Sequence, residues 1–164
     1  MAGALHSGYN GQAFSPLGDK GRFVLPPDFR KAVKVSSDGR VLCLAKHDRW
    51  NCLIGFGLSR KPELEDELDR EEEKAVRLGR DYDRDLAAMQ KFGFSEVSFD
   101  DSGRFIMPDH LATLARIEDG LYFHGAGKFF TLWNPAELGR VEAGMEAAQV
   151  TCQRLVADAE AKRK

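Results

Sequence analysis

The sequence predicts an α+β protein built from two pseudo-symmetric repeats, each with the order strand, strand, helix, strand, strand. Residues 17–33 return as residues 99–115 with Gly-Arg-Phe, an aliphatic residue and a proline at identical spacing, and such self-similarity indicates a duplicated module. Apolar residues at helical spacing between and after the repeats predict further helices. We therefore expect four segments: a first repeat at 9–61, a helical insert at 62–92, a second repeat at 93–134 and a C-terminal helix at 135–164.

Each repeat opens with a strand and a tight turn that leads into a second strand. Gly21 and Gly103 close polar segments, and glycine tolerates the positive φ that hairpin turns require. Arg22 and Arg104 follow at the first position of short apolar strands. A proline ends each strand, and the residues after it predict short helices at 27–33 and 109–115.

The second half of each repeat is a pair of apolar strands around a polar turn. Residues 42–54 align with residues 121–133 in this arrangement. The segment Gly-Ala-Gly-Lys at 125–128 is similar to the end of a phosphate-binding loop. However, Phe129 stands where Ser or Thr would hold magnesium, and the upstream glycine is missing. Its position in the repeat predicts a hairpin turn instead.

The helical insert carries apolar residues three or four positions apart, or at the sum of these steps, with Glu and Arg between them. We expect Gly79 to divide the insert into two helices and the acidic run at 71–73 to form a solvated face. The apolar positions are Leu64, Leu68, Ala75, Leu78, Tyr82, Leu86 and Met89.

The C-terminal segment predicts one helix that starts at Asn134-Pro135 and carries an apolar stripe. Such a stripe needs a partner, and the sequence leaves open whether it covers the protein's own core or a neighbouring subunit. The stripe consists of Leu138, Val141, Met145, Ala148, Cys152, Leu155 and Ala159.

Charge is distributed unevenly along a chain whose formal net charge is −2. Residues 1–61 contain ten Lys and Arg against four Asp and Glu, whereas residues 62–92 contain six against eleven. Residues 93–134 contain three against six, and the remainder is balanced. A basic first repeat is typical of a phosphate-binding face, although solvated surface charges would give the same count.

The composition argues against an enzyme. Three cysteines without close spacing, Cys43, Cys52 and Cys152, predict neither disulfides nor a zinc site, and we expect them to be buried small hydrophobic residues. The four histidines are scattered, so no metal set or catalytic triad is indicated, and an isolated turn histidine is expected to be solvated. Asp100 and Asp101 are better explained as turn caps than as an acid/base pair. We expect no catalytic site, cofactor, metal or small-molecule substrate.

Membrane association is not expected either. No cationic start followed by an apolar run occurs within residues 1–9, and no long apolar segment follows. This pattern predicts a cytoplasmic protein. Two small repeats bury little surface alone, so they are expected to need each other or a partner, and oligomerisation is an open expectation.

The repeated motifs resemble the two Asp-x-x-x-Arg motifs of the MraZ family. They read Gly-Asp-Lys-Gly-Arg-Phe-Val-Leu-Pro-Pro-Asp-Phe-Arg at 18–30 and Asp-Asp-Ser-Gly-Arg-Phe-Ile-Met-Pro at 100–108; the ending Gly-Lys-Phe-Phe-Thr-Leu-Trp at 127–133 is also similar. The resemblance, over about residues 9–160, implies an AbrB-like swapped-hairpin barrel. It also implies a nucleoid-associated regulator that forms rings on short direct DNA repeats. Such regulators usually repress the bacterial cell-division and cell-wall gene cluster.

The same resemblance implies which residues form the site. Arg22 and Arg104 would contact DNA, with Lys20 beside the first of them. Gly21 and Gly103 would shape the two turns.

The acidic position of the motif differs between the repeats. Asp100 lies four residues before Arg104, as the family motif requires. In the first motif Gly18 occupies this position and Asp19 comes one residue late. Whether Asp19 can orient Arg22 in the same way is open at this point.

A mechanism follows from the chemistry of these side chains. Arginine can reach O6 and N7 of guanine together, whereas Lys20, Arg30 and Lys31 are expected to hold phosphates. Several subunits of a ring, each reading a short element, would add selectivity. The alternative for Arg22 and Arg104 is a salt bridge with the turn aspartates, and both roles are compatible. The alternative function is an AbrB-type antitoxin that binds a protein toxin as well as DNA.

Overall fold

The computed structural model describes residues 8–163, and each repeat contains four strands and one principal helix. The first repeat comprises β1 (Gln12–Pro16), β2 (Arg22–Val24), α2 (Pro27–Ser37), β3 (Val41–Lys46) and β4 (Leu53–Phe56). The second comprises β5 (Ser95–Ser98), β6 (Arg104–Ile106), α5 (Asp109–Ala115), β7 (Gly120–Gly125) and β8 (Phe130–Trp133). This is the element order that the sequence predicts for each repeat. The predictions for the first seven residues, His6 included, and for Lys164 lie outside the described residues.

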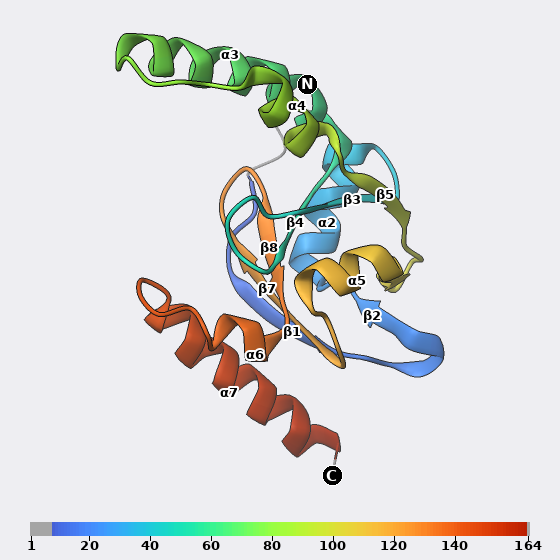
Figure 1. Ribbon diagram of the computed structural model, residues 1–164. Helices are drawn as coiled ribbons and strands as arrows, with labels where there is room; N and C mark the ends of the chain where they lie inside the picture. Colours follow the sequence, from blue (N-terminus) through green and yellow to red (C-terminus); the bar gives the residue numbers. More distant parts are fainter. Residues whose placement is uncertain (1–7, 164) are drawn as a thin grey trace.

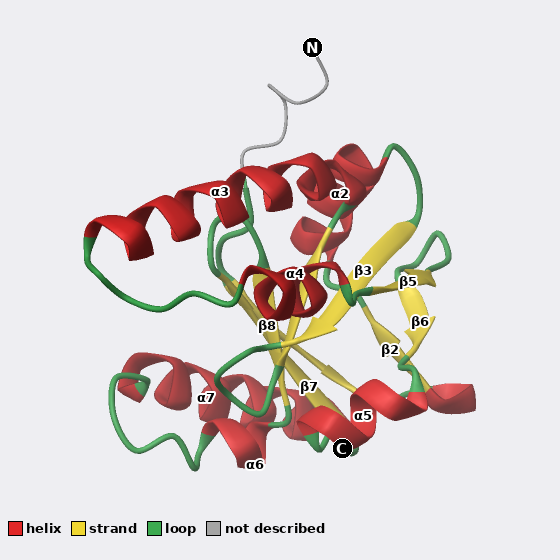
Figure 2. Cartoon of the chain, turned by 45° about the horizontal axis from the view of Figure 1, so that its top comes forward, coloured by secondary structure: helices red, strands yellow, loops and turns green. Residues whose placement is uncertain are grey.

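The strands form a six-stranded antiparallel sheet in the order β1-β7-β8-β4-β3-β5 and a two-stranded ribbon of β2 and β6 (Figures 1 and 2). From the centre outward the sheet reads β8-β7-β1 on one side and β4-β3-β5 on the other, so equivalent strands occupy equivalent places. The outer strand of each side comes from the opposite repeat, because β1 pairs with β7 and β5 pairs with β3. Neither repeat therefore completes its share of the sheet alone.

One apolar core lies between the sheet and the helices α2 and α5. Phe29 and Val33 of α2 are buried in it, and Leu111 and Ala115 of α5 occupy the equivalent positions in the second repeat. Phe29 contacts the ring of Phe130, with 4.9 Å between the ring centroids. Since both repeats contribute to one contiguous core, their burial of apolar surface is shared.

A second apolar cluster covers the opposite face of the sheet. Tyr122 and Trp133 point into it, together with Cys52, and the helix α7 (Glu146–Arg163) contributes Ala148 and Cys152. All three cysteines are buried, as predicted from the sequence. The C-terminal stripe thus packs on the protein's own sheet, which answers the question that the sequence leaves open.

The C-terminal segment is not a single helix, so this prediction is wrong. The short helix α6 (Pro135–Leu138) is capped by Asn134, whose Oδ1 accepts a hydrogen bond from the N–H of Ala136 at 3.1 Å. A loop containing Gly144, with φ of +90°, separates α6 from α7. The positive φ interrupts the helix at a position where glycine adopts it without strain.

The insert forms two helices, α3 (Lys61–Arg77) and α4 (Arg84–Phe92), and Gly79 has a φ of +64° between them as expected. Together they form an arm at one end of the molecule, opposite α6 and α7 (Figures 1 and 2). Within residues 8–163 no helix has both the length and the apolar character that a bilayer crossing requires.

Only the first half of the predicted apolar stripe on this arm is buried. Leu64, Leu68 and Ala75 are buried, whereas Leu86 and Met89 are exposed, as is Leu78. Ion pairs rather than buried apolar side chains hold α4 against α3. The guanidinium of Arg84 lies 2.9–3.2 Å from the carboxylates of Glu65, Asp69 and Glu72.

Candidate nucleic-acid interface

The β2–β6 ribbon brings the two repeated motifs together. The strands are antiparallel, with Phe23 opposite Phe105 at the centre. Side chains alternate between the two faces of a strand, and both phenylalanines point into the core, where they are about 2% exposed. The other side chains share the outward face, which we call the outward quartet: Arg22 opposite Ile106, and Arg104 opposite Val24.

Arg104 is fixed by Asp100 in the second turn. Oδ1 of Asp100 accepts hydrogen bonds from the N–H groups of Arg104 and Ser102, at 2.9 and 3.0 Å, and Oδ2 lies 2.7 Å from Nε of Arg104. The main-chain N–H of Arg104 is the largest influence that lowers the pKa of the Asp100 carboxyl, and the guanidinium contributes further. The carboxylate therefore shapes the turn and orients the arginine at the same time.

Arg22 has no equivalent carboxylate. Gly18 donates to the carbonyl of Arg22 at 2.8 Å, as Asp100 does to the carbonyl of Arg104 at 3.1 Å, so Gly18 is the structural counterpart of Asp100. Nε of Arg22 donates instead to the main-chain carbonyl of Asp19 at 3.3 Å. In the described part of the chain no ion pair within 4.0 Å joins the Asp19 carboxylate to Arg22. Asp19 thus contacts the arginine through its backbone alone.

The two turn glycines also differ in their surroundings. Gly21 and Gly103 have φ values of +67° and +84°, but only Gly103 is covered. Nε and Nη2 of Arg30 donate to the carbonyl of Leu25 at 3.3 and 3.1 Å and lie against Gly103. Leu25 also donates to the carbonyl of Gly103 at 2.7 Å. Arg30, expected from the sequence to hold a phosphate, is placed by these contacts against the second turn.

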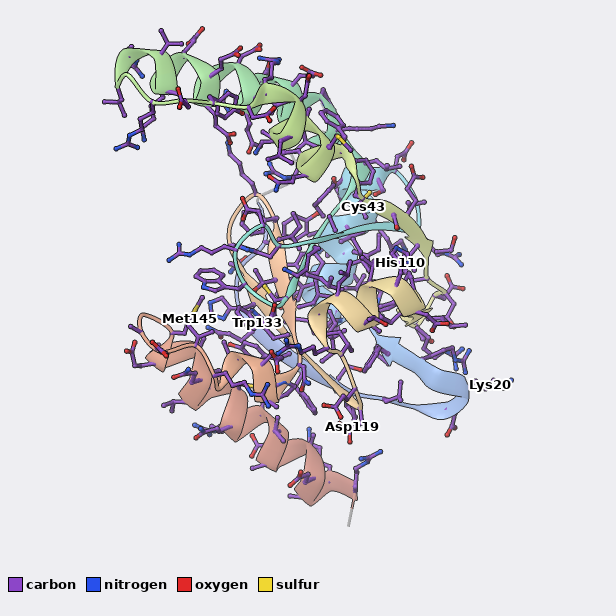
Figure 3. The ribbon with its side chains drawn as sticks, in the orientation of Figure 1. Lys20, Cys43, His110, Asp119, Trp133 and Met145 are labelled. Carbon is purple, nitrogen blue, oxygen red and sulfur yellow. The ribbon has the colours of Figure 1, made fainter. Side chains whose placement is uncertain are left out.

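The two predicted lysines are exposed. Lys20 lies in the turn between β1 and β2, which extends away from the sheet (Figure 3). Lys31 lies on α2. Two other basic residues of the first repeat form ion pairs within the protein. Arg40 lies 2.6 Å from Asp101, and Arg60 is buried beside Glu67 at 2.9 Å. The excess positive charge available to an external ligand is therefore smaller than the sequence count indicates.

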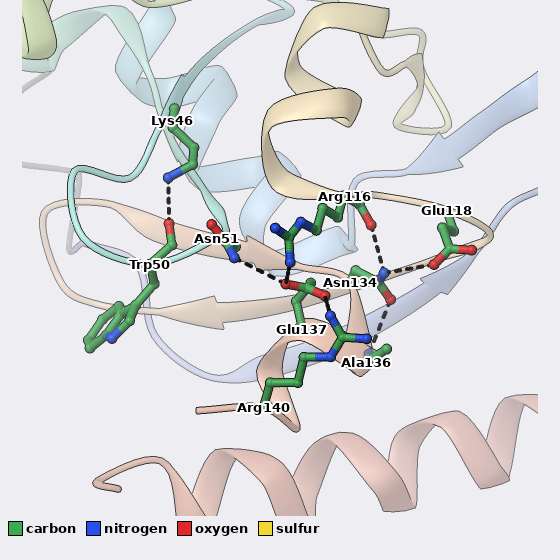
Figure 4. Close-up of polar contacts among 9 residues, drawn as sticks. All are labelled: Lys46, Trp50, Asn51, Arg116, Glu118, Asn134, Ala136, Glu137 and Arg140. Carbon is green, nitrogen blue, oxygen red and sulfur yellow. Dashed lines mark hydrogen bonds and ion pairs between the residues drawn. The ribbon is translucent and has the colours of Figure 1, made fainter. Parts of the chain in front are cut away.

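A polar cluster around Glu137 was not predicted. Oε1 of Glu137 accepts from Asn51 and Arg116, both at 3.2 Å, and Oε2 accepts from Arg140 at 2.8 Å (Figure 4). Glutamate three residues after Asn134 is typical of a capping box, but the carboxylate ties the β3–β4 turn to α5 and α6 instead. Its side chain is 5% exposed, and hydrogen bonds from two arginines and one amide offset the cost of burying the carboxylate.

His47 is also more than a solvated turn residue. Its Nδ1 accepts hydrogen bonds from the N–H groups of Arg49 and Trp50, at 3.0 and 3.2 Å. Its ring stacks on that of Trp50, with 4.8 Å between the ring centroids. Its side chain is 13% exposed, and burial lowers its pKa. The imidazole shapes the β3–β4 turn. No sequence pattern around His47 indicates this role.

The chain is similar to transcriptional regulators from several bacteria. It is 30% identical over 140 residues to "Transcriptional regulator MraZ" of Roseiflexus castenholzii, which covers 85% of this chain and 90% of that protein. The protein of the same name from Gluconacetobacter diazotrophicus is 30% identical over 138 residues, 82% of this chain and 84% of its own length. That of Parvibaculum lavamentivorans is 29% identical over 128 residues, 77% and 76% of the respective chains. No family model matches.

Proposed function

The chain belongs to the MraZ family of transcriptional regulators, and we propose that it regulates transcription by binding double-stranded DNA through the outward quartet. The observation that carries this proposal is the β2–β6 register, which presents Arg22 and Arg104 on one face while both phenylalanines anchor the ribbon in the core. A two-stranded ribbon is narrow enough to enter the major groove.

In the proposed complex the two arginines read guanine edges from diagonal corners of the quartet. The hydrogen bond that Arg104 donates to Asp100 holds the arginine side chain in position before DNA binds, which lowers the entropy cost of ordering that side chain. Arg22 lacks this restraint and orders on binding. Lys20, in the turn between β1 and β2, supplies a phosphate contact that positions the ribbon without specifying sequence.

The finer features of the proposal come from the family resemblance. We propose that residues 9–61 and 93–134 are the two units of an AbrB-like swapped-hairpin barrel, and the exchange of β1 and β5 between them supports this. We further propose a nucleoid-associated ring of subunits, each reading one short direct repeat and together repressing the cell-division and cell-wall gene cluster. Avidity across several repeats would multiply the modest selectivity of each subunit.

The test compares binding of the wild-type protein and of Arg22→Ala to DNA from the protein's own upstream region and to scrambled DNA. Loss of a base-reading arginine is expected to weaken specific binding by about 1–3 kcal/mol, with a smaller effect on scrambled DNA. Arg154→Ala, an exposed arginine on α7, serves as the control. Equal discrimination by Arg22→Ala and the wild type would reject base reading by this residue.

Two further measurements address the assembly. Titrating salt should give a linear fall of log affinity with log salt concentration, whose slope reports the phosphates engaged. The mass of the protein in solution tests the ring. A monomeric mass at the concentrations used for binding would contradict the ring, while leaving DNA recognition by one subunit to be judged from Arg22→Ala.

A further inference from the structure

We propose that Val24 and Ile106, the aliphatic members of the outward quartet, read the methyl groups of thymines beside the bases that the arginines contact. The inference rests on the proposed function and adds recognition of thymine to the recognition of guanine by the arginines. The two residues occupy equivalent positions in the two repeats and are 38% and 63% exposed. Each lies opposite an arginine in the ribbon, Val24 opposite Arg104 and Ile106 opposite Arg22.

Packing within the fold does not explain why these two side chains are aliphatic. In the described part of the chain, both lie outside the two apolar clusters. Among residues 8–163, the other large apolar side chains with comparable exposure lie on helices or, for Leu78, directly after one: Val35, Val76, Leu78, Leu86, Met89, Leu114 and Val150. Exposed aliphatic side chains on the ribbon therefore coincide with the face that carries both arginines.

The chemistry of the major groove matches this arrangement. Guanine presents two acceptors that suit arginine, and thymine presents a methyl group that suits an apolar side chain. Directly opposite residues of an antiparallel pair have Cβ atoms about 5 Å apart, so an arginine and its aliphatic partner can reach neighbouring base pairs. Valine and isoleucine are branched at Cβ and have few side-chain rotamers, which suits contact with a small fixed group.

The quartet therefore presents two donor–aliphatic pairs related by the pseudo-symmetry of the repeats. Each pair is complementary to a step that contains a guanine and a thymine. The apolar area gained at one methyl is small, and burying one such group is expected to change affinity by about threefold to fivefold.

Replacement of single thymines by uracil tests the inference, because uracil lacks the methyl and keeps the pairing edge and O4. DNA from the upstream region is prepared with each thymine replaced in turn, and affinities are measured by competition. For the wild type we expect a loss of about threefold to fivefold at one or two positions. Val24→Ala should bind thymine and uracil equally at one of these positions, and Ile106→Ala should do so at the other.

Val76→Ala is the matched control, since Val76 is 75% exposed on α3. This variant should keep the wild-type sensitivity to uracil at every position. Uracil tolerated everywhere by the wild type, while Arg22→Ala loses discrimination, would overturn thymine reading and leave the proposed function intact. Sensitivity to uracil that persists in Val24→Ala and Ile106→Ala would also overturn it. Failure of Arg22→Ala to alter discrimination is the separate result that speaks against the proposed function.

Discussion

The two arginines of the ribbon differ through a single residue at the start of each turn. The carboxylate of Asp100 accepts hydrogen bonds from both the backbone and the side chain of Arg104. Gly18 has no carboxylate, and the side chain of Arg22 donates one hydrogen bond to a main-chain carbonyl. Gly18 itself has an ordinary extended backbone, with φ of −102°. A Cβ added there would lie 3.4 Å from the nearest atom, the carbonyl oxygen of Arg22. Nothing in the fold therefore requires glycine at this position.

Gly18→Asp should stabilise the first turn by reproducing the contacts of Asp100. We expect an increase of about 0.5–1 kcal/mol in the free energy of unfolding, since the new carboxylate can accept main-chain hydrogen bonds at a solvent-exposed turn. Chemical denaturation measures the change. Gly18→Ala is the control, because it adds the Cβ and restricts the unfolded chain without adding a carboxylate. Equal stability of the two variants would show that the carboxylate does not engage the turn.

His47 predicts a pH-dependent change in the β3–β4 turn. Its pKa is lowered by burial, so protonation favours the unfolded state, where the pKa is about 6.5. The stabilisation is complete above that pH and is lost as pH falls through the lower pKa of the folded protein. Protonation of Nδ1 also removes the acceptor for two N–H groups.

The fluorescence of Trp50, which stacks on His47, should report this transition on acidification. His47→Asn retains a side-chain acceptor that does not titrate, and the transition should be absent from this variant. Trp50→Phe should likewise lack the pH-dependent part of the emission. A transition of unchanged size in His47→Asn would assign the pH dependence to another group.

At the scale of elements, the two turns differ in backbone shape and in packing. Lys20 and Gly21 have φ values of +60° and +67° in the first turn, whereas between Asp100 and Arg104 positive φ occurs at Gly103. An alanine Cβ at Gly103 would lie 2.5 Å from Nε of Arg30 and 2.6 Å from the carbonyl oxygen of Leu25, whereas at Gly21 nothing lies within 4 Å. The second turn is therefore docked against the first repeat, and the first turn is open to solvent.

This difference predicts unequal costs for the same substitution. Gly21→Ala should cost about 1 kcal/mol, from the left-handed backbone alone. Gly103→Ala should cost about 2–4 kcal/mol, because overpacking against Leu25 is added to the same backbone strain. Thermal or chemical unfolding of both variants gives the comparison. Equal losses would mean that the second turn can move away from Arg30 freely.

For the whole molecule, the exchanged strands predict that the repeats unfold together. Phe105→Ala in the second repeat should cost about 3–5 kcal/mol, the usual loss for a buried phenylalanine. Ile106→Ala, one residue along the same strand and exposed, should change stability by less than about 0.5 kcal/mol.

Single-tryptophan variants place one probe in each repeat, because Trp50 lies in the β3–β4 turn and Trp133 on β8. In the Phe105→Ala background both probes should show the same unfolding midpoint, as a two-state transition requires. A lower midpoint for Trp133 with an unchanged midpoint for Trp50 would instead identify two independent units.

The local order of the elements could be predicted from the amino-acid sequence, because turn glycines, strand-ending prolines and apolar periodicity act over a few residues. The sequence located Arg22 and Arg104 at the first position of their strands and the break at Gly79. It did not predict the loop that separates α6 from α7, nor the exposed half of the stripe on the arm, because ion pairs of Arg84 replace apolar contacts there.

The exchange of strands between the repeats and the contacts between distant side chains depend on the three-dimensional arrangement of the chain. Contacts such as Arg30 on Gly103, or Glu137 with Asn51 and Arg116, join residues far apart in sequence, and no local pattern encodes them. The pairing of β2 with β6 is of the same kind. It placed both arginines and both aliphatic residues on one face, because register and alternation together fix the direction of every side chain in a ribbon.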